Sequence, residues 1–179
     1  MLTGLVMTRT DSDEDGWDRA SVKIDGMTLL ARAKRLMQEC QCERIQVTPV
    51  GAYEALEVMY QLMSTQQCKG GLLVVPVDMP LLTPSILKGL TEVGKLTGRP
   101  SSFHDKPLPA FLPVNQSVCA MVHQELANGR RGSVHSLFSR FGGIQLVCQQ
   151  TSALHQIRHE QDWERLKPQH DNRLAPKHS

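Results

Sequence analysis

Aromatic residues are scarce in this sequence of 179 residues, where phenylalanine, tryptophan and tyrosine together make up 4%. So few rings argue against a base-stacking surface for single-stranded nucleic acid. The net charge of +2 is also too small to indicate a nucleic-acid partner. No apolar run approaches the roughly 18 residues of a membrane span. No basic segment precedes the short apolar stretch at the start, so we expect no signal peptide.

Cysteine is also sparse, and its spacing argues against a structural zinc site. There are five cysteines, an odd number, and Cys40 and Cys42 form a C-x-C pair with no second pair at a zinc-site distance. We therefore expect reduced thiols in a cytoplasmic protein that binds neither membrane nor nucleic acid.

What the sequence does have is an alternation of apolar strand patterns and amphipathic helix patterns. The run from Leu72 to Val75 does not alternate, which indicates burial on both faces, as in a parallel sheet. This order predicts one three-layer α/β domain with a mostly parallel sheet over residues 1–167, then a flexible C-terminal tail at 168–179. We expect strands at 2–7, 44–50, 70–80, 108–114 and 144–148, and helices at 29–40, 53–63, 84–93, 116–129, 133–141 and 160–166. The hydroxyls of Thr28 and Thr83 are expected to cap the helices at 29–40 and 84–93.

Ligands of such sheets bind beyond the carboxyl ends of the strands. Two segments fall at that edge. One is the acidic segment Asp11–Asp18, which holds five acids in eight residues directly after the first strand. The other is Asp78-Met79-Pro80 after the central strand. Asp11-x-Asp13-x-Asp15-Gly16 matches half of a calcium loop, but the bidentate glutamate is missing, so only weak cation binding stays open.

Two longer stretches resemble the molybdenum cofactor guanylyltransferases. They are "LLVVPVDMPLLTPSIL" and "KPLPAFLPVNQSVCAMVHQELANGRRGSVHSLFSRFGG", and the resemblance extends over nearly the whole chain up to about Leu166. It implies a Rossmann-like nucleotidyltransferase fold and a Mg²⁺-dependent transfer of GMP from GTP to molybdopterin, with release of pyrophosphate. Asp78 stands at the position of the family's metal-binding aspartate, where a hard oxygen ligand would hold Mg²⁺ against the phosphates.

The family's phosphate loop reads approximately L-A-G-G-x-S-x-R-M-G-x-D-K and aligns with residues 7–19. Ser12, Gly16 and Asp18 match it, and Arg19 replaces the lysine with its charge kept. The resemblance makes these four residues nucleotide-binding positions, with Arg19 also contacting phosphate during catalysis. 

By the same resemblance, His104 and Lys106 lie in a loop that faces the substrate site. They would contact an anionic pterin, or they form a polar turn with no ligand.

Three departures from the family pattern affect the same site. Arg9 and Thr10 replace the two glycines, and Glu14 replaces the arginine. Side chains at the glycine positions block the approach of phosphate to the backbone. Each added carboxylate also repels the triphosphate, by about 4 kcal/mol for unit charges 4 Å apart at an effective dielectric of about 20. The segment between Val47 and Gly71 is shorter than in the family, and residues 156–160 lack the family's Asn-x-Asn-x-Pro.

We therefore expect a divergent nucleotidyltransferase related to the molybdenum cofactor guanylyltransferases, with impaired or altered nucleotide transfer. The alternative is a non-catalytic protein that binds pterin or a partner in molybdoenzyme maturation. The sequence leaves open whether the chain is an active enzyme. Mg²⁺ is the only cofactor that the resemblance implies.

Overall fold

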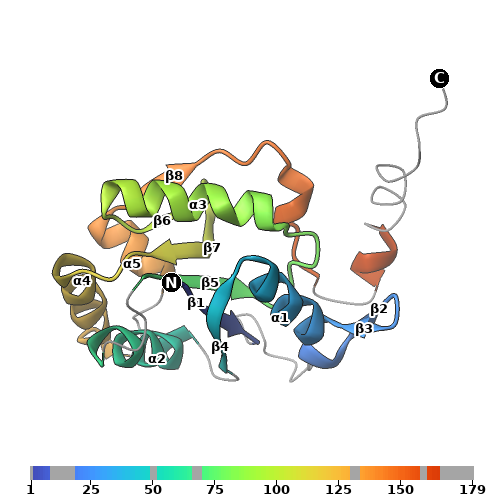
Figure 1. The fold of residues 1–179 in the computed structure, drawn as a ribbon, viewed down its shortest axis with the longest axis horizontal. Helices are drawn as coiled ribbons and strands as arrows, with labels where there is room; N and C mark the ends of the chain where they lie inside the picture. The colour runs from blue at the N-terminus through green and yellow to red at the C-terminus, as the bar shows by residue number, and fades with distance from the viewer. Residues whose placement is uncertain are drawn as a thin grey trace.

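The computed structural model describes residues 2–8, 19–48, 52–65, 70–129, 134–157 and 161–165. Six strands form its main sheet: β1 (Leu2–Met7), β4 (Cys42–Thr48), β5 (Leu72–Pro76), β6 (Ser101–Phe103), β7 (Lys106–Leu112) and β8 (Ile144–Leu146). Their order across the sheet is β4-β1-β5-β7-β6-β8 (Figure 1). β1 pairs in parallel with β4 and β5, and β6 with β8, whereas β7 runs antiparallel to β5 and β6. The expected mostly parallel sheet is thus confirmed.

Helices cover both faces of this sheet. They are α1 (Leu29–Glu39), α2 (Ala52–Ser64), α3 (Pro84–Thr97), α4 (Gln116–Leu126) and α5 (Val134–Phe141). One hydrophobic core lies between the sheet and α1 and α3, and the other between the sheet and α2, α4 and α5. In β5, Leu73 and Val75 face the first core and Leu72 and Val74 the second, all fully buried. The apolar run therefore has the two-sided burial that its sequence indicates.

Short hydroxyl side chains set the starts of two helices as expected. Thr28 ends the small hairpin of β2 (Lys23–Ile24) and β3 (Met27–Thr28), and its Oγ1 accepts a hydrogen bond from the backbone N–H of Ala31 at 3.1 Å. Thr83 Oγ1 accepts from the N–H of Ile86 at 3.3 Å in the same way. Both bonds satisfy a donor that the first helical turn leaves unpaired.

α3 runs four residues beyond the expected end near Val93. A glycine weakens a helix, but a glycine is needed at position 94 because a β-carbon there would lie 2.2 Å from Cδ1 of Phe111. The glycine lets α3 lie close on β7, and the helix instead ends at Gly98, which has φ +67°.

The sequence did not predict β6. The sequence places His104 and Lys106 in a loop and predicts no strand before it, but Ser101–Phe103 pairs with both β7 and β8, and His104 and Asp105 form the tight turn into β7. Ser101 and Ser102 are buried, and the Ser101 hydroxyl donates to the Leu90 carbonyl of α3 at 2.8 Å. That bond satisfies a polar side chain inside the core, which residue type alone does not reveal.

The domain bounds remain a prediction, because residues 166–179 lie outside the described part of the chain. Among the described residues, none of the helices is both long enough and apolar enough to cross a membrane.

Candidate functional site

Asp78 lies at the carboxyl edge of the sheet, two residues beyond the end of β5. The backbone N–H of Val77 donates to the carbonyl oxygen of Met7 at 2.9 Å, so β1 and β5 stay hydrogen-bonded to each other up to their carboxyl ends. Asp78 follows directly and is fully buried. A buried carboxyl group is retained where polar partners or a cation compensate its desolvation. The end of β1, which the acidic segment follows in the sequence, therefore lies next to the strand end that carries Asp78.

The C-terminal part of the chain returns to Asp78 and contacts it twice. The side-chain amide of Gln156 donates to Oδ2 of Asp78 at 3.4 Å, and the backbone N–H of Ile157 donates to its carbonyl oxygen at 2.8 Å. The side chains of Ile157 and Trp163 are buried in the core beneath α1 and α3. These apolar anchors fix the segment, so that Gln156 stays against the carboxylate.

The position of this contact agrees with the sequence alignment, although the residue there is a glutamine and not the family's asparagine. The alignment puts 156–160 at the family's asparagine segment beside the metal position, and the structure brings Gln156 to Asp78. A glutamine amide offers the same donor and acceptor groups as an asparagine on a longer side chain.

The expected nucleotide-binding residues Ser12, Gly16 and Asp18 lie outside the described residues, as do Arg9–Asp15. Arg19 begins a short 3₁₀ helix, η1 (Arg19–Ser21), which packs against α1. Their roles in binding a nucleotide stay predictions.

His104 and Lys106 lie at the same sheet edge as Asp78. β5 and β6 both run antiparallel to β7, so the end of β6 and the start of β7 fall beside the end of β5. The exposed ring of His104 contacts Oε1 of Gln145 through Nδ1 and Oδ2 of Asp105 through Nε2, both at 3.3 Å. Asp105 takes the left-handed turn conformation, with φ +61°. The polar-turn interpretation therefore accounts for the contacts of His104, and a pterin contact stays a prediction.

A pocket of about 240 Å³ lies between α1 and the segment 76–82, and Val77 and Met79, the two neighbours of Asp78 in the sequence, line it. Its polar wall includes Arg32 and Arg35, and within the described residues the buried Nε of Arg32 has no hydrogen-bond partner. The Arg32 guanidinium lies 5.9 Å from the ring centre of Trp163, within cation–π range. Sequence reasoning did not select these arginines. Their spacing of three on one helix is the signal that could have marked them.

A magnesium ion is compatible with the donor at this edge. Mg²⁺ in nucleotide sites is typically held by one or two carboxylates together with substrate phosphates and water, and Asp78 supplies one such carboxylate. Among the described residues, no group of three His, Cys, Asp or Glu side chains gathers around a common point. Asp78 is the candidate ligand, and phosphate oxygens and water would complete the shell of a bound ion.

Comparisons with known proteins identify the fold. No family model and no curated protein matches the chain. Among solved structures, molybdopterin-guanine dinucleotide biosynthesis protein A from Archaeoglobus fulgidus matches with a TM-score of 0.67 and 14% identity, over 96% of this chain and all of that one. The 2-C-methyl-D-erythritol 4-phosphate cytidylyltransferase from Thermus thermophilus matches with 0.62 and 14%, over 94% of this chain and 98% of that one. A nucleotidyl transferase from Methanothermobacter matches with 0.57 and 15%, over 98% and 99%.

Sequence identities this low show a shared fold and nothing about function. At that level they confirm the resemblance found in the sequence: over nearly its full length, this chain has the three-layer α/β fold of the nucleotidyltransferases.

Proposed function

We propose that this chain is a divergent relative of the molybdenum cofactor guanylyltransferases that keeps their scaffold and metal position but is impaired or altered in nucleotide transfer. The observation that supports the retained position is Asp78, fully buried at the carboxyl end of β5. In an open α/β sheet this is where a ligand meets the ends of parallel strands.

In an active site of this kind, Asp78 would hold Mg²⁺, which neutralises phosphate charge when it is bound. Gln156 would keep one carboxylate oxygen in a fixed direction through its amide, and Arg19 would contact a phosphate. The buried Ile157 holds the backbone that positions Gln156. These residues supply binding and orientation.

The acidic segment is the reason to propose impaired transfer. Backbone N–H groups of a glycine-rich loop normally surround phosphates, and basic side chains neutralise them. This chain has Arg9 and Thr10 at the glycine positions and Glu14 at the arginine position. Arg19 retains the positive charge of the motif's lysine position, and five acids precede it in the sequence within eight residues.

A second candidate function is non-catalytic binding of a pterin or of a partner in molybdoenzyme maturation. The position of His104 and Lys106 at the same sheet edge favours it, since that edge stays available to an anionic ligand even if the triphosphate position does not.

Isothermal titration of GTP and of CTP with Mg²⁺ tests the proposal. We expect the wild-type protein to bind neither more tightly than about millimolar. Micromolar binding that disappears in Asp78→Asn, but persists in the exposed control Asp105→Asn at the same sheet edge, would overturn the view that transfer is impaired. A parallel titration with a reduced pterin separates the second candidate, because only that function predicts pterin binding without nucleotide binding.

A further inference from the structure

The sulfur atoms of Met37 and Cys42 lie close together where α1 ends and β4 begins. Cys42 Sγ lies 3.9 Å from Sδ of Met37, whose side chain is fully buried. Cys40, two residues before Cys42, packs against the same hydrophobic core. Burial and the nearby Cys40 thiol together raise the pKa of Cys42 to about 12. All three sulfur-bearing residues thus border the same core on one side of the sheet.

Gly4 on the neighbouring strand β1 makes room for this cluster. A β-carbon at position 4 would lie 2.9 Å from Sδ of Met37 and 3.2 Å from Sγ of Cys42. A glycine inside a buried strand weakens the strand and commonly marks a close approach. Here the space it leaves is filled by the two sulfur atoms.

The separation of the two sulfurs matches that of two ligands on one metal ion. Metal–sulfur bonds are about 2.3 Å long, so two sulfur ligands at 120° around an ion lie about 4.0 Å apart. The observed 3.9 Å would need little rearrangement.

We propose that Cys40, Cys42 and Met37 form a binding site for one soft monovalent metal ion of the Cu(I) type. Thiolate and thioether ligands together suit Cu(I), whereas structural zinc sites need a shell of four ligands, either thiolates alone or thiolates with imidazole. The set here holds two thiols and a thioether. It is a different kind of site from the zinc site that the cysteine spacing argues against.

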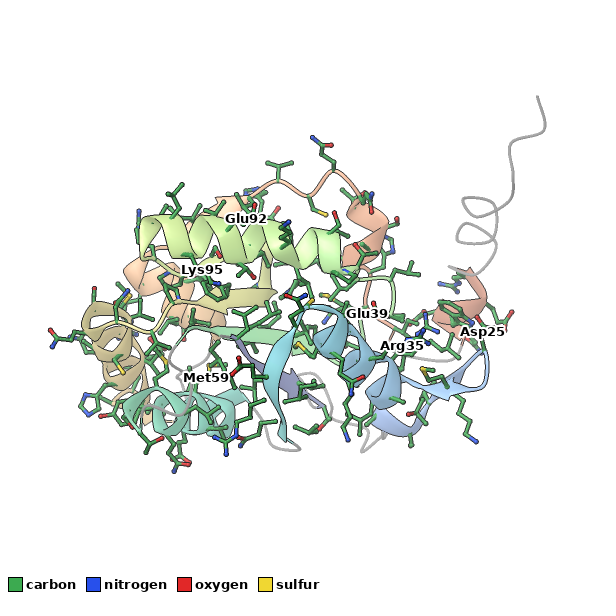
Figure 2. All side chains as sticks on the ribbon, viewed as in Figure 1. Asp25, Arg35, Glu39, Met59, Glu92 and Lys95 are labelled. Atoms are coloured by element: carbon green, nitrogen blue, oxygen red, sulfur yellow. The ribbon has the colours of Figure 1, made fainter. Side chains whose placement is uncertain are left out.

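The ion has a route to this site from solvent. Cys40 lines a groove of about 460 Å³ between the end of α1 and α3, and Lys88 and Lys95 line the same groove. Three of the residues that line this groove are labelled in Figure 2: Glu39 on α1, and Glu92 and Lys95 on α3. Two thiolates and one monovalent cation leave a net charge of −1, beside a groove that two lysines and two glutamates line together.

Binding exchanges protons for metal. Thiolates are the metal-binding form of cysteine, and an unperturbed cysteine is a thiol below a pKa of about 8.5. One Cu(I) therefore replaces two thiol protons, which are released, and binding tightens as pH rises.

The test is an anaerobic competition titration of the reduced protein against a coloured Cu(I) chelator such as bicinchoninate. We expect the wild-type protein to withdraw one equivalent of Cu(I). Cys40→Ser combined with Cys42→Ser should weaken this binding at least about a hundredfold. Met37→Leu, which nearly conserves volume and should leave the fold intact, should weaken it about tenfold. The control Cys148→Ser removes another half-buried cysteine and should bind as the wild type does.

Three results would overturn the proposal. One is the absence of high-affinity Cu(I) binding in the wild type. Another is Cu(I) affinity equal to that of the wild type in the double serine variant or in Met37→Leu. The third is tighter binding of Zn²⁺ than of Cu(I), which would contradict the soft ligand set. Thermal unfolding of each variant without metal shows that a loss of binding does not come from a loss of fold.

Discussion

Replacing Gln156 with glutamate would place a second carboxylate against the buried carboxylate of Asp78. The structure gives 3.4 Å between the two side chains. At that distance two unit charges repel by about 5 kcal/mol at an effective dielectric of about 20, and by about 2 kcal/mol at about 50. Gln156 is only half-buried, so we take the lower figure. It corresponds to about a thirtyfold change in the unfolding equilibrium.

The repulsion between the two carboxylates should make the stability of Gln156→Glu depend on pH. The repulsion raises the folded-state pKa of one carboxyl above its unfolded value of about 4. The variant should therefore resemble the wild type near pH 4, where the pair shares a proton. Its free energy of unfolding should then fall, relative to wild type, as pH rises through the raised folded pKa.

Urea unfolding at about pH 4 and about pH 7.5 measures this difference. The uncharged control Gln156→Met removes the hydrogen bond and should cost about 1 kcal/mol, with a weaker dependence on pH. If Gln156→Glu and Gln156→Met lose the same free energy of unfolding at both pH values, residue 156 does not lie against an ionised Asp78.

Two further predictions concern packing and thiol chemistry. Gly94→Ala should lower the free energy of unfolding by about 1–3 kcal/mol, because the new β-carbon meets Phe111 at 2.2 Å. Gly89→Ala on the same helix has no atom within 4 Å of its new β-carbon and should be neutral or slightly stabilising, so equal thermal unfolding of the two variants would contradict this packing. With pKa values raised to about 11 and about 12, Cys40 and Cys42 should react with iodoacetamide at pH 8 far more slowly than glutathione. Peptide mass spectrometry follows that reaction, and rapid labelling of either cysteine would refute the burial described.

Local signals predicted much of the fold, because they act within a few residues. The apolar run Leu72–Val75 marks the central strand, and the hydroxyls of Thr28 and Thr83 mark two helix starts, all of which the structure bears out. Such features depend on backbone propensity and short-range hydrogen bonds, which sequence patterns carry.

Features that depend on distant partners were not predicted. Ser101 is a polar residue whose burial rests on the Leu90 carbonyl, eleven positions away on another element. Gly94 weakens a helix by its residue type, but Phe111 makes the glycine necessary. At the site, the alignment gave the position of Gln156, whereas its hydrogen bond to Asp78, 78 residues away, needed the tertiary structure.

We propose that the chain retains a nucleotidyltransferase scaffold while its acidic segment opposes the triphosphate. The most direct test of this claim is titration of GTP with Mg²⁺ into a variant that combines Arg9→Gly, Thr10→Gly and Glu14→Arg. We predict at least about a tenfold gain in affinity over wild type, abolished when Asp78→Asn is added, because the glycines admit phosphate and the arginine replaces a repulsion with an attraction. Unchanged affinity in the triple variant would contradict the claim.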